Sequence, residues 1–469
     1  MAIIVQERRD FAEHVAVAVV GGGACGLTAA TAAAAAGAEV LLLEQDQRLA
    51  GSTAMSLGAL CAAASAEHHR HGIADSAEIF YADVMAKTAG RADAALARLI
   101  AEQSGPSADW LTQQHDVALQ LDFKWTSLGH SHPRLHMPPG RNGAELVTLL
   151  ERAALQAGAN IMLAARVVDL CVDAHGTITG VGIQRPDGSR EWLGATAVVL
   201  ASCGFGGNHV LVRQFIPDMA HARYFGHEGN RGDALLWGQA LNAALADLSA
   251  YQGLGTLADP QAVVVPHPLI LEGGWMVNQL GERFTHENEN ISGLCVPVNR
   301  QPQSRAWVIF DAARHEVCLT HSVEQRELAA LGALRRGTSW AELAGKCELP
   351  VQTLAREAAL IDAARAAGKP DRFGRRFDSV APLAPEFCAV RVTGALFHTQ
   401  GGLVVDADAR VQKRDGSVFR NLFAGGGAAR GISGPDVTGY LPGAGLCMAI
   451  TLGRIAGQTA ARVAHEKSA

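Results

Sequence analysis

Residues 14–44 read HVAVAVVGGGACGLTAATAAAAAGAEVLLLE, and this stretch decides the fold. A short apolar run typical of a buried strand leads into glycines in G-x-G-x-x-G spacing, at Gly21, Gly23 and Gly26. An alanine-rich helical segment follows, and a second apolar run ends in Glu44. This order of strand, glycine-rich turn, helix, strand and acid predicts a βαβ unit that binds a dinucleotide.

Each part of the unit has a physical task. Gly21 allows a tight turn, Gly23 lets the backbone approach a pyrophosphate, and Gly26 lets the helix pack closely against the strand. The free N–H groups at the start of the helix, beside Ala24, and the positive end of the helix dipole suit phosphate groups. Glu44 can accept a hydrogen bond from a ribose hydroxyl. An ordinary strand–helix turn is the alternative interpretation.

The composition describes a globular protein with a large core. The chain has 469 residues, 48% apolar and 18% charged, so it has room for more than one domain. Its formal net charge of -6 gives no electrostatic reason to expect nucleic acid or an anionic membrane as a partner. No long apolar span lacks a polar interruption, and no basic leader precedes the first strand, so we expect no membrane segment.

The nine cysteines are scattered and form no C-x-x-C pair. An odd, scattered set favours reduced thiols over a disulfide framework or a zinc site. It also offers no clustered ligands for a c-type haem or an iron–sulfur cluster. We therefore expect a cytoplasmic protein.

The segment after the second strand carries a more specific pattern. GSTAMSLG at 51–58 resembles the flavin-contacting loop of the succinate dehydrogenase/fumarate reductase flavoprotein family, which includes the 3-ketosteroid Δ1-dehydrogenases. Ser52, Thr53 and Ser56 would offer donors to the pyrophosphate and the flavin edge, and Gly58 would allow close approach to the ring. A Ser/Gly-rich surface loop is the alternative. Membrane-complex members carry a histidine here that bonds covalently to the flavin, so its absence predicts non-covalent FAD.

Further segments match the same family in order along the chain. VNQLGERFTHENE at 277–289 is similar to a hairpin of the family's cap domain, and GKPDRFGRRFD at 368–378 to the end of that domain. The resemblance implies an α/β fold, with a Rossmann-like FAD-binding domain and an inserted α+β cap (substrate) domain. We expect the FAD-binding domain at 1–251 and 386–469, and the cap domain at 252–385.

The resemblance extends to the later cofactor contacts. It places the backbone of Val167 near the adenine, and ATAVVLASCGF at 195–205 resembles a strand that passes the adenosine half. The glycine-rich start of the last helix would face the pyrimidine end of the flavin and stabilise negative charge there. Motif and resemblance together assign to FAD Gly21, Gly23, Ala24, Gly26, Glu44, Gln45, Ser52, Thr53, Ser56, Gly58, Val167, Ala201, Gly204, Gly426, Gly443, Ala444, Gly445 and Leu446.

Two other segments have less decisive patterns. GHSHPRLHMPPGRNG at 129–143 contains three histidines, but no carboxylate lies among them and Pro133 interrupts the run, so we predict no metal site. We expect a solvated basic loop near the substrate mouth.

Gly232, Asp233 and Ala234 resemble the family's Gly-Asp-Gly helix start, although Asp233 also suits the first turn of any helix.

The chain departs from the fumarate reductases of the family at three places where those enzymes carry cations. ENENISG at 287–293 contains no arginine, Phe397 stands at the place of a clamping histidine, and Tyr440 at the place of a second arginine. These departures point to an uncharged or mono-anionic substrate. They also make a fumarate-reductase mechanism doubtful.

Tyr440, in GYLPGAG, is similar to the Tyr–Pro–Gly segment of the ketosteroid dehydrogenases. There a tyrosine hydroxyl and a glycine N–H hold the ketone oxygen, which stabilises an enolate. A structural tyrosine capping the last helix is the alternative role. The tyrosine bases of those enzymes have no counterpart here, so His398 and then His286 are the candidate bases.

These features predict an FAD-dependent oxidoreductase that acts on CH–CH bonds. We expect it to introduce a C=C bond next to the carbonyl of a cyclic ketone, by removal of the α-proton and hydride transfer to the flavin. The substrate would be a small molecule, and the electron acceptor is open. One alternative is a flavin-dependent reductase of an activated alkene, and another is a flavin-binding protein without turnover.

Overall fold

The structure is a computed structural model that describes residues 2–5, 11–123 and 126–468. The chain divides into two compact units. The first unit comprises Met1–Pro217, Gly226–Tyr251 and His398–Ala469. The second unit comprises Asp218–Phe225 and Gln252–Phe397, and it is therefore an insertion into the first.

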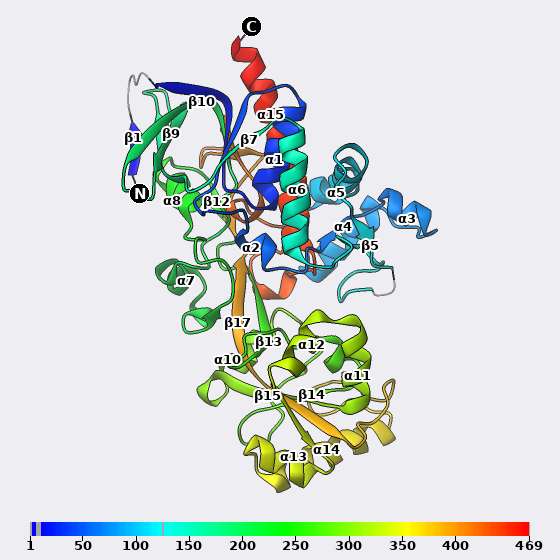
Figure 1. The fold of residues 1–469 in the computed structure, drawn as a ribbon. Coiled ribbons are helices and arrows are strands. Elements are labelled where there is room, and N and C mark those ends of the chain that lie inside the picture. The colour runs from blue at the N-terminus through cyan, green and yellow to red at the C-terminus, as the bar shows by residue number, and fades with distance from the viewer. Residues whose placement is uncertain (1, 6–10, 124–125, 469) are drawn as a thin grey trace. The chain divides into compact units, whose positions relative to one another are not determined.

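A largely parallel sheet forms the centre of the first unit (Figure 1). Strands β10 (Arg190–Leu200), β2 (Glu13–Val20), β3 (Val40–Leu43) and β7 (Asn160–Met162) pair in parallel in this order. Strand β20 (Val418–Ala424) pairs in parallel with the end of β10 and so joins the C-terminal part of the chain to the same sheet. The carboxyl ends of these strands form the edge at which open α/β sheets bind ligands.

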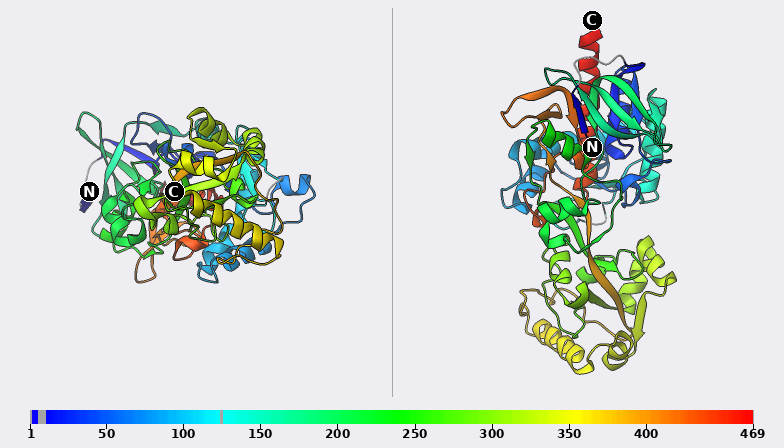
Figure 2. Two further views of the ribbon diagram at one scale, coloured as in Figure 1. Left: turned by 90° about the horizontal axis from the view of Figure 1, so that it is seen from below. Right: turned by 90° about the vertical axis from the view of Figure 1, so that its left-hand side faces the viewer.

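Helix α1 (Ala24–Ala35) leaves β2 through the glycine-rich turn and lies beside the C-terminal helix α15 (Ala444–Ser468) (Figures 1 and 2). Gly21 adopts a φ of 108°, in the region that favours glycine. A Cβ on Gly26 would lie 1.8 Å from the carbonyl oxygen of Gly21, so only glycine fits there. The predicted βαβ unit is therefore present, and its glycines have the steric roles that the motif implies.

The remaining elements of the first unit surround this sheet. Their bounds are α2 Gly51–Ala54, α3 Ala66–Arg70, α4 Ala77–Lys87, α5 Ala94–Gln114, α6 Gly143–Gln156, α7 His209–Phe215, α8 Asp233–Ala240, β1 Ala2–Val5, β4 Leu60–Cys61, β5 Gln120–Leu121, β6 Leu135–Met137, β8 Arg166–Val172, β9 Ile178–Gln184, β12 Leu245–Ala246, β18 Gly402–Leu403 and β19 Arg410–Gln412. Among the described residues, no helix combines the length and the apolar character that crossing a membrane requires.

The second unit is built on a smaller, mostly antiparallel sheet. Its central strands are β17 (Phe387–Thr399) and β15 (Arg305–Asp311), which pair along most of their length. The other elements are β11 Arg223–Tyr224, β13 Tyr251–Ala258, β14 Trp275–Val277, β16 Leu334–Gly337, α9 Pro268–Leu271, α10 Cys295–Asn299, α11 Ala312–His321, α12 Val323–Ala330, α13 Trp340–Cys347 and α14 Val351–Ala366. Apolar clusters on the two faces of β15 and β17 form its core.

The insertion ends later than we expected. Its end was predicted at residue 385, but the second unit continues to Phe397. The reason is that β17 begins as a partner of β15 in the second unit and runs on to Thr399, two residues into the first unit. One strand thus belongs to both units, and a boundary drawn from the resemblance of separate segments misses this.

A buried ion network joins segments 277–289 and 368–378, which resemble the hairpin and the end of the family's cap domain. The Glu287 carboxylate accepts hydrogen bonds from Arg283 and Arg375, each at 2.8 Å, and from the Met276 N–H at 2.9 Å. Arg283 also bonds to Asp371. Burial would raise the pKa of Glu287, but the charges of Arg283 and Arg375 outweigh it and lower the pKa to about 2. Both sequence motifs are therefore held together by charge.

Candidate active site

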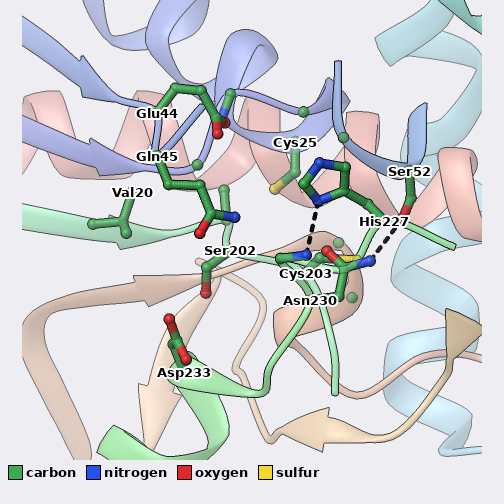
Figure 3. A pocket seen from close by; sticks show the side chains of 18 of the residues that line it. Val20, Cys25, Glu44, Gln45, Ser52, Ser202, Cys203, His227, Asn230 and Asp233 are labelled. Carbon is green, nitrogen blue, oxygen red and sulfur yellow. Dashed lines mark hydrogen bonds between the residues drawn. The ribbon is translucent and has the colours of Figure 1, made fainter. Parts of the chain in front are cut away.

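A pocket opens at the carboxyl ends of the parallel strands in the first unit (Figure 3). Its walls come from the turn after β2, from α2, from the start of β8, from the end of β10 and from the segment that leads into α8. Of the residues predicted to hold FAD, those lining it are Gly21, Gly23, Ala24, Glu44, Gln45, Ser52, Thr53, Val167, Ala201 and Gly426. Those outside it are Gly26, Ser56, Gly58, Gly204, Gly443, Ala444, Gly445 and Leu446.

Two side chains fix the glycine-rich turn at the base of this pocket. The Glu44 carboxylate accepts hydrogen bonds from the Gly22 N–H at 2.7 Å and from the Asp46 N–H at 2.9 Å. The Thr53 hydroxyl accepts a hydrogen bond from the Ala24 N–H at 3.0 Å. Burial raises the pKa of Glu44. A carboxylate oxygen has a second lone pair, so Glu44 can hold the turn and still accept a ribose hydroxyl.

Replacing Glu44 with alanine is expected to weaken FAD binding about tenfold or more, because a charge-assisted hydrogen bond contributes roughly 1.5–3 kcal/mol. The Gly22 N–H loses its partner as well, so part of the loss comes from the turn rather than from the ribose. Titration of the apoprotein with FAD, followed by flavin fluorescence, measures it. Glu39→Ala, at an exposed acid just before β3, is the matched control. An unchanged Glu44→Ala dissociation constant would assign the ribose contact to another residue.

The loop around α2 supports the pocket from the other side. The Asn230 amide donates a hydrogen bond to the Ser52 hydroxyl at 2.7 Å (Figure 3). The Ser56 hydroxyl donates to the Thr53 carbonyl at 2.7 Å and accepts from the Gly58 N–H at 3.0 Å. Ser56 and Gly58 therefore shape the turn, while Ser52 and Thr53 reach the pocket.

Several pocket residues were not predicted from the sequence. The segment 226–237 contributes His227, Gly229, Asn230, Asp233 and Trp237 to the lining. His227 is 2.8 Å from the carboxylate of Asp46. Only the resemblance of Gly232–Ala234 to a family helix start pointed to this segment. The sequence of a loop does not show which distant strands it contacts in the fold.

The polar content of the pocket fits a dinucleotide. Buried atoms without a hydrogen-bond partner among the described residues include Ser202 Oγ, Asp233 Oδ1, Trp237 Nε1 and Arg166 Nε, and all four residues line the pocket. Unsatisfied buried polar groups are rare in native proteins, because each costs free energy. A bound nucleotide with ribose hydroxyls and ring nitrogens supplies the missing partners. The glycine-rich turn at the start of α1 supplies N–H groups for a pyrophosphate.

Two thiols also line the pocket, those of Cys25 and Cys203 (Figure 3). Burial raises the pKa of Cys25 to about 12 and also raises the pKa of Cys203. Both thiols are therefore protonated at neutral pH and are poor nucleophiles.

Two of the three candidate catalytic residues lie together in the first unit. The rings of His398 and Tyr440 are 5.8 Å apart, centroid to centroid, in an edge-on arrangement. A Cβ on Gly445, in the first turn of α15, would lie 3.0 Å from the His398 ring, so this glycine lets the imidazole reach the helix start. The third candidate, His286, belongs to the second unit, where its Nδ1 accepts the Asn288 N–H at 3.2 Å.

Both rings are uncharged at neutral pH. Burial raises the pKa of the Tyr440 phenol well above its usual value, so its O–H is available as a donor. Burial lowers the pKa of His398 to about 4. The Gln400 amide nitrogen is 2.8 Å from His398 Nδ1, and the Gln400 oxygen accepts a hydrogen bond from Ser433 at 3.1 Å. These features favour a neutral His398 that donates a hydrogen bond over the base expected from the sequence.

The expectation of a solvated basic loop at 129–143 is wrong for His130, Arg134 and His136, which are buried, whereas residues 139–142 are exposed. Arg134 is only 1% exposed, and its guanidinium bonds to Asp75 twice at 2.7 Å and to Asp83 at 2.5 Å. Arg134 also donates to His130 Nδ1 at 3.3 Å, which leaves the proton on Nε2 for the bond to the Pro442 carbonyl at 3.0 Å. Ion pairs with two distant acids thus allow the arginine to be buried. Through His130, the loop also bonds to the turn between Tyr440 and α15.

Comparison with known proteins also indicates FAD binding. A family model described as FAD binding domain matches residues 16–448. The probable fumarate reductase Ifc3 of Shewanella frigidimarina (strain NCIMB 400) is 28% identical over 458 residues, which is 97% of this chain and 76% of the relative. The urocanate reductase of Eggerthella lenta is 27% identical over 463 residues, which is 96% of this chain and 75% of the relative.

Solved structures show the same fold. The open conformation of a flavocytochrome c3 fumarate reductase superposes with a TM-score of 0.83 at 28% identity, covering 97% of this chain and 79% of that one. The 3-ketosteroid-Δ4-(5α)-dehydrogenase of Rhodococcus jostii RHA1 gives a TM-score of 0.76 at 24% identity, covering 96% and 98%. Because the family match spans nearly the whole chain, the protein belongs to the succinate dehydrogenase/fumarate reductase family of flavoproteins and is an FAD-dependent oxidoreductase.

Proposed function

We propose that the protein dehydrogenates the carbon–carbon bond next to the carbonyl of an uncharged cyclic ketone. The observation that carries this proposal is the pair of neutral rings, Tyr440 and His398, at the start of α15. Neutral hydrogen-bond donors suit a neutral carbonyl oxygen that gains negative charge during the reaction. A dicarboxylate, in contrast, calls for cationic groups of the kind that the fumarate reductases of the family carry.

The chain's own residues would share the work as follows. Tyr440 donates its O–H to the substrate carbonyl oxygen, and the neutral His398 ring lies against it as a second polar group. Polarising the carbonyl acidifies the neighbouring carbon, so a base can remove the α-proton. The base for this step is not assigned, since His286, the other histidine predicted as base, belongs to the second unit. FAD, when bound, supplies the acceptor for the hydride.

An aromatic pair supports an uncharged substrate. Phe397 packs against Phe225 with ring centroids 5.3 Å apart, within the second unit. By resemblance, Phe397 stands where a fumarate reductase places a clamping histidine. A phenyl ring there offers an apolar surface to a ring-bearing substrate and no charge to a carboxylate.

Reduction of an alkene conjugated to a carbonyl is the second candidate function. The similar proteins named above include a probable fumarate reductase and a urocanate reductase, which run this chemistry in the reducing direction. The same donor pair would polarise the carbonyl of such an alkene. We also propose a cytoplasmic location, because an odd number of scattered cysteines favours reduced thiols over a disulfide framework.

Anaerobic mixing distinguishes these functions. The oxidised protein is mixed with a panel of cyclic ketones, and the dithionite-reduced protein with a panel of enones and enoates. Bleaching of the flavin absorbance by a saturated ketone supports dehydrogenation, whereas reoxidation by an alkene without bleaching by any ketone supports reduction. Reoxidation by fumarate alone would contradict the proposed preference for uncharged substrates.

The FAD is expected to be held without a covalent bond. Ser52 and Thr53 lie on the loop where membrane-complex members carry the attaching histidine, and neither forms a stable bond to the flavin ring. Acid precipitation should therefore release the yellow chromophore into the supernatant, and mass spectrometry of the protein should give the mass of the unmodified chain. Colour that stays with the pellet would contradict non-covalent binding.

A further inference from the structure

One end of the FAD pocket contains a group of buried polar atoms without partners. Ser202 Oγ, Asp233 Oδ1 and Trp237 Nε1 have no hydrogen-bond partner among the described residues, and all three residues line the pocket. Asp233 is 7% exposed and Trp237 is 1% exposed. Figure 3 shows Ser202 and Asp233 among the side chains that surround the pocket. These atoms are shielded from water, and no described residue forms a hydrogen bond with them.

The neighbouring contacts show which end of the pocket this is. The Ala165 N–H donates to the carbonyl oxygen of Glu44 at 2.8 Å, so the start of β8 lies beside Glu44. Arg166 follows directly, and its guanidinium is 3.9 Å from the Asp233 carboxylate. Asp233 therefore lies on the Glu44 side of the pocket. In βαβ dinucleotide sites, the acid at the end of the second strand contacts the adenosine ribose.

Trp237 belongs to the same side because of helix geometry. Helix α8 begins at Asp233, and residues four apart lie one above the other on one face of a helix. The Asp233 side chain does not cap its own helix, whose N-cap is Gly232. Burial raises the pKa of Asp233, because a carboxylate without donors is costly in this position. Both residues line the pocket, and the Asp233 carboxylate makes no capping hydrogen bond that would compete with a ligand there.

We propose that Trp237 donates its indole N–H to the adenosine half of the bound FAD, beside Asp233 and Ser202 as polar neighbours. An indole is a donor only and a carboxylate is an acceptor only, so the two side chains require different atoms of the ligand. Adenosine supplies both kinds, ring nitrogens and ribose oxygens as acceptors, and amino and hydroxyl groups as donors. The consequence is selectivity, because FMN and riboflavin carry the same flavin but no adenosine.

Titration of the apoprotein with two flavins tests this inference. Trp237→Phe removes the N–H donor and keeps an aromatic ring, and it is expected to raise the dissociation constant of FAD about 3- to 10-fold. The dissociation constant of FMN should not change. Trp237→His, which restores a ring N–H, should recover part of the FAD affinity. Trp110→Phe, at a buried tryptophan outside the pocket, is the control and should change neither constant.

Two outcomes of this titration would overturn the proposal. An unchanged FAD affinity in Trp237→Phe shows that the indole makes no contact with the ligand, and an equal loss for FAD and FMN shows a general packing defect. A second measurement needs no variant, in case substitution at this buried site prevents folding. ADP should alter the tryptophan emission of the wild-type apoprotein, and inorganic pyrophosphate should not. ADP binding that calorimetry detects without any change in emission would also overturn the proposal.

Discussion

Replacing Glu287 with alanine is expected to lower the free energy of unfolding of the second unit by about 3–5 kcal/mol. The substitution leaves Arg283 and Arg375 buried beside one another without their shared carboxylate. Arg283 keeps Asp371 as a partner, but Arg375 is left buried without a paired carboxylate, and a buried charge that has lost its counter-ion is costly. Urea unfolding followed by tryptophan emission measures the loss, since Trp275 and Trp307 lie in the core of this unit.

The effect should depend on pH in a defined direction. The pKa of Glu287 is lowered to about 2 in the folded protein from an ordinary value of 4.5. Its stabilising contribution is therefore fully present above about pH 4.5 and is lost as the pH falls towards 2. The difference in stability between wild type and Glu287→Ala should shrink over this range. Glu289→Ala, at an exposed acid two residues away, is the control. Equal stability of both variants at pH 7 would show that the network contributes nothing.

The parts of the fold that could be predicted from the sequence depend on short-range steric demands. Gly21 and Gly26 are five residues apart, and the Cβ excluded at Gly26 is excluded by the carbonyl of Gly21 itself. The turn, the helix and the acid at Glu44 belong to one continuous segment, so one motif describes them all. The pocket base was predictable for this reason.

The loop at 129–143 could not be predicted in the same way. Its sequence is basic. Arg134 is neutralised by Asp75 and Asp83, which lie 59 and 51 residues earlier in the chain. The Pro442 carbonyl that His130 holds is 312 residues away. Burial of a charge depends on such distant partners, so local composition gave the opposite expectation.

The catalytic candidates Tyr440 and His398 could be predicted from the sequence only in part. Tyr440 and His398 were chosen from separate segments of the chain, and the structure brings their rings within 5.8 Å of one another. The sequence could not show that burial would lower the pKa of His398 to about 4, because this shift depends on the packing around the ring. The expected base is therefore better suited to donate a hydrogen bond. Trp237 was missed altogether, since a single tryptophan in a short helix carries no motif.

Replacing Tyr440 with phenylalanine is expected to lower turnover by roughly 10²–10³ on the ketone or enone that the panel identifies. The substitution removes one hydrogen-bond donor to the developing negative charge and keeps the ring. Flavin content should barely change because Tyr440 does not line the FAD pocket, and the melting temperature should barely change because phenylalanine keeps the ring that packs against the core. Tyr81→Phe, at a partly buried tyrosine whose ring packs under Arg98, is the matched control and should keep full turnover.

The pH profile then separates the roles of Tyr440 and His398. The folded pKa of His398 is lowered to about 4, so the neutral ring is present above this pH and is lost below it. If His398 acts as a base, wild-type turnover falls as the pH drops through about 4 and His398→Ala lacks this fall; if it only donates a hydrogen bond, no such fall occurs, because the imidazolium keeps its N–H. Tyr440→Phe should keep the same acidic limb at a lower rate, since the phenol is protonated throughout the range. Near-normal turnover of Tyr440→Phe would mean that backbone N–H groups around Gly443 hold the carbonyl, or that the substrate is not a ketone.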